Sequence, residues 1–137
     1  MATISLNRKV LLKVIVSQEF KDSFSKQLEV LRSEVSANIE KLKSEESKLL
    51  LNIGTTLGVQ ERSNVMSRIS KERESQEIAK KEIEDKINEV KNLEIGTFYP
   101  YATLDGVVEI KEGDNIWEKL NGGEIVIRDG VVVSIKS

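Results

Sequence analysis

A long stretch without proline most constrains how this chain can fold. Residues 17–93 contain no proline, and their only glycines are Gly54 and Gly58. Ser17 is a suitable cap for the N-terminus of a first helix. The two glycines lie in "NIGTTLG" and supply the break that a chain reversal needs. Residues 17–93 are therefore predicted to form a helical hairpin that turns near residues 54–58.

Heptad spacing of apolar residues supports both helices of this hairpin. The first helix contributes Phe24, Leu28, Leu31, Val35, Leu42 and Leu49, with Asn38 and Glu45 at two core positions. The second contributes Val65, Ile69, Ala79, Ile83, Val90 and Leu93, with Glu72, Gln76 and Lys86 at core positions. An antiparallel register that aligns the two sets centres the reversal on residue 57 and places Glu45 beside Arg68 and Ile69.

Both apolar stripes are thin for helices of this length. We therefore expect the helices to gain stability from self-association or from a protein partner that lies along them. In an alternative arrangement the glycines straighten and the helices exchange between two chains of a dimer. Both arrangements are compatible with the sequence.

The two ends of the chain are predicted to meet in one small sheet. Val10–Val16 indicates a strand that enters the first helix directly. Because the hairpin returns the chain to the same end, this strand is expected to lie next to everything after residue 94. The later strands are expected at Val107–Ile110, Glu124–Arg128 and Val131–Ile135.

The predicted fold class is α+β. A long antiparallel helical hairpin, or coiled coil, projects from a small β-sheet or half-barrel formed by both chain ends. The chain is organised into an N-terminal strand (1–16), the hairpin (17–93), and a connection with the C-terminal strands (94–137). The connection "EIGTFYPYATLDG" holds the only proline, Pro100, and Asp114 is expected to cap a short helical turn that follows. An open sheet and a closed barrel both fit the sequence.

The segment "VIRDGVVVSI" indicates a β-hairpin that can adopt two registers. A two-residue turn of Asp129 and Gly130 would scatter apolar residues over both faces of the sheet. A three-residue loop of residues 128–130 would pair Ile127 with Val131 and gather the apolar residues on one face. Since a slip of one residue moves every side chain to the other face, we expect the three-residue loop.

Composition argues against several classes of activity. The chain has no histidine and no cysteine, so it lacks the commonest metal ligands and the side chain that titrates near neutral pH. It also lacks a glycine-rich phosphate loop and a serine nucleophile motif. Three aspartates that neighbour glycines, Asp105, Asp114 and Asp129, stand in separate turns and do not form a calcium loop. We expect no enzyme activity, no cofactor and no metal.

The expected location is the cytoplasm. The longest apolar run, Val10–Val16, is interrupted by Lys13 and is far shorter than the ~20 residues that a membrane span requires. No basic start and no small-residue cleavage site accompany it, so no signal peptide is apparent. The absence of cysteine suits a reducing compartment. We therefore expect no contact with a membrane.

Two sets of residues are candidates for binding. The basic residues near the hairpin turn suit RNA phosphates, with an ordinary solvated helix face as the alternative; they are Lys48, Arg62, Arg68, Lys71 and Arg73. The aromatic residues near the sheet suit a protein-binding groove, with a sealed core as the alternative; they are Phe98, Tyr99, Tyr101 and Trp117.

Three motifs resemble those of a known family. "VSQEFK" after the first strand, "VVEIKEGDNIWEKL" and "EIVIRDGVVVSI" occur in this order. In this respect the chain resembles the YlqD family of small bacterial proteins, along nearly its whole length. The family is uncharacterised, so the resemblance implies no catalytic or ligand residues. Genes of the family lie, in some bacteria, among genes for ribosomal proteins and ribosome maturation, which implies a ribosomal context.

The hypothesis favoured by these observations is a non-enzymatic module that binds or assembles proteins through its coiled-coil hairpin. The partner is expected to be a protein, and a homo-oligomer through the helices is a further expectation. The alternative hypothesis is a factor that associates with RNA or the ribosome and contacts phosphate through the end of the hairpin.

Overall fold

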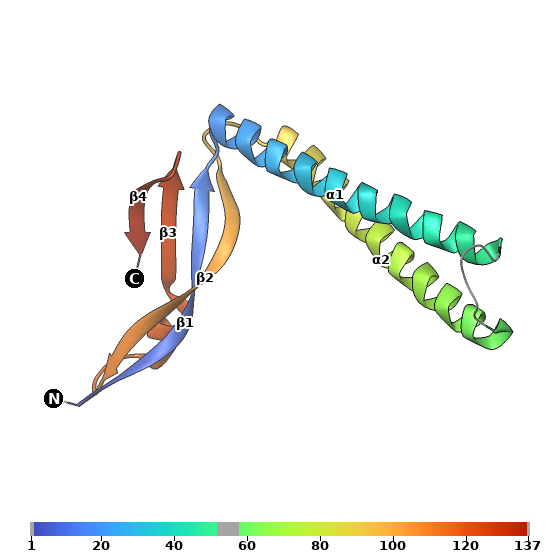
Figure 1. The fold of residues 1–137 in the computed structure, drawn as a ribbon. Coiled ribbons are helices and arrows are strands. Elements are labelled where there is room, and N and C mark those ends of the chain that lie inside the picture. The colour runs from blue at the N-terminus through green and yellow to red at the C-terminus, as the bar shows by residue number, and fades with distance from the viewer. Residues whose placement is uncertain (1, 52–57, 137) are drawn as a thin grey trace. The chain divides into compact units, whose positions relative to one another are not determined.

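The computed structural model of the chain describes residues 2–51 and 58–136. It contains two compact units: one comprises Met1–Asp22 with Leu93–Ser137, and the other comprises Ser23–Asn92. The elements, in chain order, are β1 (Thr3–Ile15), α1 (Gln18–Leu50), α2 (Val59–Lys91), β2 (Phe98–Lys111), α3 (Ile116–Asn121), β3 (Gly123–Arg128) and β4 (Val131–Lys136) (Figure 1). The predicted α+β class is confirmed.

The sheet is formed from both ends of the chain, as predicted. Its strand order is β2-β1-β3-β4, with β1 antiparallel to β2 and parallel to β3, and with β3 antiparallel to β4. Among the described residues the sheet is open and does not close into a barrel. Because β1 lies between β2 and β3, the N-terminal strand is an interior strand. The buried apolar residues of the strands are Val14, Tyr99, Val108 and Val126, and Val16 is buried directly after β1.

The second strand is much longer than the sequence predicted. β2 spans Phe98–Lys111, so the expected connection is mostly strand. Pro100 misled the prediction, because proline cannot donate to a ladder hydrogen bond. β2 is an edge strand, where proline is tolerated, and the register shifts between Leu12 and Lys13 opposite this position.

The β3–β4 connection differs from the expected three-residue loop. Arg128 pairs with Val131, so the turn contains only Asp129 and Gly130, whose φ angles are +48° and +82°. Two positive φ angles are typical of the type I′ turn, whose twist suits a hairpin. A bulge then shifts the register opposite Val126 and Ile127. The predicted register was wrong because it did not include the bulge. With a two-residue turn, the bulge brings Ile135 opposite Ile125, on the same face as Val132 and Ile127.

Local hydrogen bonds explain where two helices begin. The Ser17 hydroxyl accepts a hydrogen bond from the Phe20 amide at 3.0 Å, which confirms Ser17 as the cap of α1, and it donates to the Asp129 carboxylate in the β3–β4 turn. Asn115, and not Asp114, caps α3, because its side-chain oxygen accepts from the first amides of that helix. Asp114 instead accepts a hydrogen bond from the Lys111 amide.

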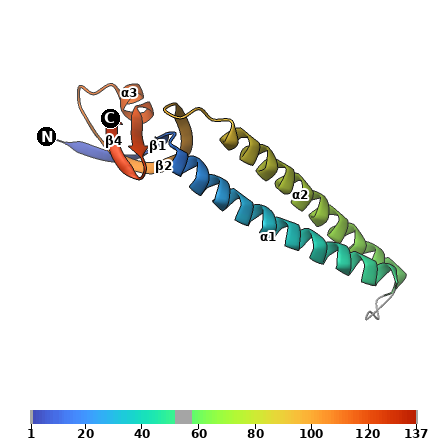
Figure 2. The ribbon, with the colours of Figure 1, turned by 90° about the horizontal axis from the view of Figure 1, so that it is seen from above.

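The helices α1 and α2 lie side by side and antiparallel (Figure 2). Most of the predicted turn at 54–58 lies outside the described residues. Its last residue, Gly58, is the N-cap of α2. No helix of the described residues carries an apolar stretch long enough to cross a membrane.

The heptad residues of α1 fall into two rows with a spacing of seven residues, one through Leu28 and one through Leu31. The structure confirms the first row as interior and contradicts the second. Leu28 is buried as expected, but Leu31 is 47% exposed and Asn38 is exposed, whereas Ile39 is buried. The second row of α1 therefore runs one residue later than predicted. In α2 the same shift buries Ile87.

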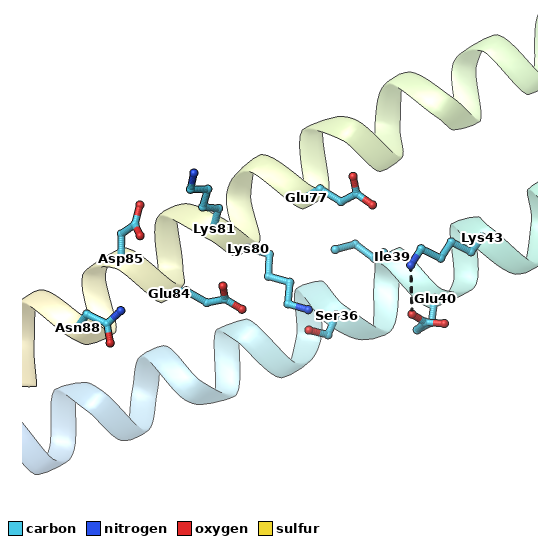
Figure 3. Close-up of a pocket in the computed structure, with 10 residues that line it drawn as sticks. All are labelled: Ser36, Ile39, Glu40, Lys43, Glu77, Lys80, Lys81, Glu84, Asp85 and Asn88. Atoms are coloured by element: carbon cyan, nitrogen blue, oxygen red, sulfur yellow. Dashed lines mark ion pairs between the residues drawn. The ribbon is translucent and has the colours of Figure 1, made fainter.

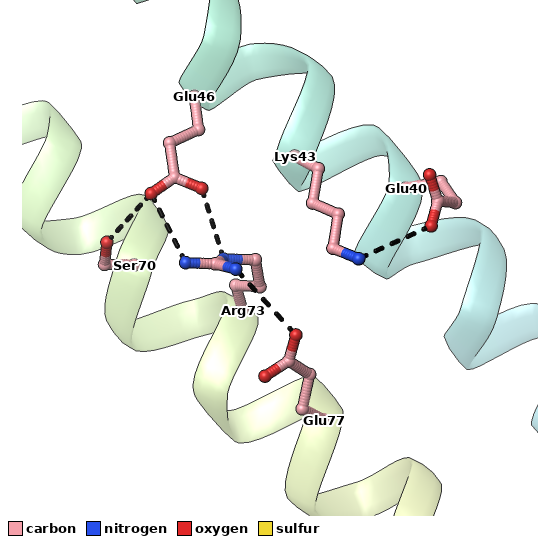
Figure 4. A network of polar contacts seen from close by, with 6 residues as sticks. All are labelled: Glu40, Lys43, Glu46, Ser70, Arg73 and Glu77. Carbon is pink, nitrogen blue, oxygen red and sulfur yellow. Dashed lines mark hydrogen bonds and ion pairs between the residues drawn. The ribbon is translucent and has the colours of Figure 1, made fainter. Parts of the chain in front are cut away.

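The predicted pairing of the two helices was also wrong. Glu45 was expected beside Arg68 and Ile69. The structure instead joins Glu46 to Ser70 and Arg73, which moves the register by about one helical turn (Figure 4). The physical reason is that the hairpin buries Ile39 and Ile87, which the prediction left outside, together with Leu28 and Val90, which it placed inside.

Candidate functional site

A groove on one face of the sheet draws residues from all four strands. Its volume is about 340 Å³, and it is lined by Lys13 and Ile15 of β1, Phe98 of β2, Glu124 and Val126 of β3, and Val133 and Ser134 of β4. Val126 is buried, while Phe98 and Val133 are 62% and 52% exposed. The groove thus has an apolar floor beside two exposed apolar side chains, which suits an apolar guest. We call this side of the sheet the groove face.

The pairing of strands explains why these side chains converge. Ile15 lies opposite Phe98 and Lys13 lies opposite Val126, and residues opposite each other in a sheet share a face. Alternate residues of each strand point the other way, so Val14 and Tyr99 belong to the opposite face.

An ion pair between Lys13 and Glu124 forms the polar part of the groove. The hydrogen bond from Lys13 lowers the pKa of Glu124; burial acts against this shift, and the charges of Lys13 and Lys136 reinforce it. Glu124 is therefore an anion at neutral pH. A carboxylate held in this way is suited to orienting a polar group of a ligand and is a weaker base than an ordinary glutamate.

The four predicted aromatic groove residues occupy three different places. Tyr99 and Tyr101 contact Phe20, with ring centroids 5.9 Å and 6.1 Å apart, and Tyr99 is 4% exposed. These rings seal the start of α1 against β2, which matches the alternative that we considered for the aromatic residues. Phe98 lies on the groove face.

Trp117 is remote from Phe98 along the sheet. It lies in α3 and is 73% exposed. The helix α3 is held by Arg8, whose Nη1 donates to the Lys119 carbonyl at 2.8 Å. Arg8 is seven residues along β1 from Ile15, the partner of Phe98, or about 23 Å. Phe98 is thus the single predicted aromatic residue that lines the groove.

The five predicted RNA-contacting residues differ in exposure and in their partners. Lys48, Arg68 and Lys71 are exposed, whereas Arg62 and Arg73 are half-buried. Arg73 forms ion pairs with Glu46 at 3.2 Å and Glu77 at 3.9 Å (Figure 4). Its charge is largely balanced by these carboxylates, which weakens the positive field that would attract phosphate.

A second groove runs between α1 and α2 and has a volume of about 460 Å³ (Figure 3). It is lined by Ser36, Ile39, Glu40, Lys43, Glu77, Lys80, Lys81, Glu84, Asp85 and Asn88. Lys80 extends across it toward Ser36. Charges of both signs alternate along it and Ile39 is its single apolar residue, so it has the character of a solvated helix face and not of a site for a small ligand.

The three aspartates weighed as calcium ligands are each engaged in a separate interaction. Asp105 forms an ion pair with Lys9, Asp114 accepts from the Lys111 amide, and Asp129 accepts from Ser17. Asp105 lies within β2 and not in a turn. These contacts stabilise local structure.

The structure defines a class of protein: an α+β chain with an open four-stranded sheet, made from both chain ends, and an antiparallel helical hairpin inserted between them. Comparison with known families identifies the family, because the model of the family described as YlqD protein matches residues 4–136. The chain belongs to the YlqD family, as the sequence motifs predicted.

A solved structure shares this fold. The crystal structure of a protein of unknown function from Synechococcus sp. WH 8102 superposes with a TM-score of 0.85 at 21% identity, and the match covers 99% of this chain and 96% of that chain. None of the curated proteins compared with the chain matches it. The likeness establishes the fold, and the function has to be argued from the groove.

Sequence reasoning did not identify most of the groove. Lys13, Ile15, Glu124, Val126 and Val133 were assigned to strands but not to a site. Alternation along residues 10–16 already places Lys13 and Ile15 on one face. The pairing of β1 with β3 was the missing information, since it brings Glu124 and Val126 from more than a hundred residues away.

Proposed function

We propose that the chain is a non-enzymatic protein-interaction module of the cytoplasm, and that it holds an apolar side chain of a protein partner in the sheet groove. The observation that carries this proposal is the exposed ring of Phe98 beside a buried apolar floor. An aromatic side chain at the edge of an apolar groove is a common anchor in protein interfaces. The ion pair of Lys13 and Glu124 would orient the polar backbone of the bound segment.

The ends of the helices beside the turn also support protein binding. Leu50, Leu51 and Val59 are 71%, 70% and 79% exposed. Large apolar side chains gathered at the end of a hairpin favour an apolar pocket on a partner over the phosphates of RNA. The hairpin would thereby provide a second contact surface for an assembly factor.

The test is site-specific photo-crosslinking with matched positions. A photoreactive residue at Phe98 is compared with one at Ile95, which is equally exposed but does not line the groove. The proposal expects one partner that crosslinks at position 98 and not at position 95, and whose capture is lost in Phe98→Ser but kept in Ile95→Ser. Equal crosslinking at both positions would contradict it.

The alternative function, contact with RNA or the ribosome, is supported by the exposure of Lys48, Arg68 and Lys71. Replacing these three with glutamine while keeping Arg73 leaves the pair with Glu46 intact. If the chain binds RNA, the triple variant loses the ribonuclease-sensitive particles and its binding depends less steeply on salt. If the groove is the site, the partner crosslinked at position 98 is retained by this variant.

A further inference from the structure

The strand β4 is an edge strand with an apolar surface. Its six residues are all exposed, and the exposed fractions of Val131, Val132, Val133 and Ile135 range from 52% to 72%. The other edge of the sheet, β2, carries Pro100 and acidic residues, which are features that prevent pairing with another strand. In β4 the first charged residue is Lys136.

Strand pairing assigns each residue of β4 to a face. Val132 and Ile135 lie opposite Ile127 and Ile125 of β3, on the face away from the groove. Val131, Ser134 and Lys136 lie opposite Arg128, Val126 and Glu124, on the groove face. Val133 also lies on the groove face, because it lines the groove together with Ser134.

The bulge makes this arrangement symmetric. Val132 and Ile135 lie on the opposite face, and the other four residues of β4 lie on the groove face. The order of faces is therefore the same from Val131 to Lys136 as from Lys136 to Val131. When a second copy of β4 pairs antiparallel over its full length, each residue therefore lies opposite a residue whose side chain is on the same face of the sheet. A regular six-residue strand, whose side chains alternate between the faces, cannot pair with itself in this way.

We propose that two copies of the chain associate through antiparallel pairing of β4 about a two-fold axis. Val132 of one copy lies opposite Ile135 of the other, Val133 opposite Ser134, and Val131 opposite Lys136. The two Val132–Ile135 pairs bury four exposed apolar side chains on one face. Such a contact uses the same surface twice and closes on itself, so the joined sheet ends in the two protected β2 edges.

The symmetric order of faces along β4 favours a second copy as the occupant. Antiparallel pairing places Lys136 of one chain opposite Val131 of the other, next to Arg128 and Asp129, whose charges have opposite signs, so the contact rests on the apolar pairs and not on charge. The proposal does not rest on the binding of a partner in the groove. It also differs from self-association through α1 and α2, whose remaining exposed apolar residues, Val30, Leu31 and Ile78, form no continuous stripe in the described part of the hairpin.

The first test measures mass against concentration by sedimentation equilibrium. We expect a reversible dimer for the full chain, and Ile135→Glu should weaken it by at least about tenfold, because each carboxylate would be buried against Val132 of the other copy. The matched control is Val107→Glu, which alters an equally exposed apolar residue of β2 and should leave dimerisation unchanged. A monomer at all concentrations, or equal effects of the two variants, would overturn the proposal.

The second test reads the register directly, since the chain contains no cysteine of its own. Mixing equal amounts of Val132→Cys and Ile135→Cys chains under mild oxidation should give the mixed disulfide in far more than the twofold excess over either homodimer that random pairing produces. In the proposed register, residue 132 of one chain lies about 10 Å along the strand from residue 132 of the other chain, which is too far for a disulfide. Homodimers formed as readily as the mixed species would contradict antiparallel pairing of β4.

Discussion

Val10 occupies a position between two glycines of the sheet. A Cβ atom at Gly106 or at Gly123 would lie 2.9 Å from the Cγ2 atom of Val10, closer than carbon atoms approach in proteins. Gly123 pairs directly with Val10 in β3, and Gly106 lies on β2. The absence of both side chains therefore allows the interior strand to carry a β-branched residue at this point.

A double-mutant cycle tests this packing. Gly123→Ala should lower the free energy of unfolding by about 1–3 kcal/mol, because its methyl group overlaps Val10. In a Val10→Ala background the same substitution should cost much less, so the two changes should couple by more than about 0.5 kcal/mol. Urea unfolding of the four proteins measures the coupling. Additive effects would show that the two residues do not compete for the same space.

The ion pair in the groove predicts a dependence of stability on pH. The pKa of Glu124 is lowered in the folded chain, chiefly by Lys13, so the folded state holds its proton less tightly than the unfolded state. This contribution to stability is complete above the ordinary glutamate pKa and is lost as the pH falls through the lowered folded pKa. A carboxylate titration of Glu124 by NMR should move to higher pH in Lys13→Met. An unchanged titration would place the cause elsewhere.

At the scale of the elements, the helices were easier to predict than their mutual packing. The absence of proline and the spacing of glycines located α1 and α2 to within a few residues. Periodicity did not distinguish a row through Leu31 and Asn38 from a row through Arg32 and Ile39, since each contains one apolar and one polar residue. The choice depends on the partner helix, which a single helix does not reveal.

Two matched substitutions test the corrected row. Ile39→Ala should destabilise the helical unit by about 2–4 kcal/mol, because Ile39 is 5% exposed. Leu31→Ala should cost less than about 1 kcal/mol, since Leu31 is 47% exposed. Chemical unfolding followed by the circular dichroism of the helices gives both values. Equal losses would restore the row that the sequence predicted.

The strands show a different limit of sequence reasoning. The segment that holds Pro100 was taken as a connection, although an edge strand accepts proline. Treating residues 94–106 as a connection concealed the alternation that separates Phe98 from Tyr99 and Tyr101. Of the four predicted aromatic residues only Phe98 lines the sheet groove, because the composition of the groove depends on pairing between distant strands and not on local pattern.

At the scale of the whole molecule, the two units differ in how far apart in sequence their contacts lie. The sheet pairs Thr3 with Lys111 and Val10 with Gly123, whereas Glu46 meets Arg73, which is 27 residues away in the sequence. Local contacts form faster than distant ones because less chain entropy is lost in closing the loop.

This difference predicts an order of folding. Amide protons of α1 and α2 should become protected in the microsecond to millisecond range, and those of β1 later, in about milliseconds to seconds. Pulsed hydrogen exchange during refolding measures both. Protection of β1 before or together with the helices would show that the sheet does not wait for the hairpin.

The interior position of β1 has a consequence for the synthesis of the chain. Its partners, β2 and β3, are translated after the entire helical hairpin, so at about 5–20 residues per second the first strand waits roughly 5–20 s for its neighbours. Throughout that time Val10–Val16 is an apolar strand with both edges unpaired. The nascent chain thus passes through a stage in which its N-terminal strand is a substrate for chaperones that recognise extended apolar segments.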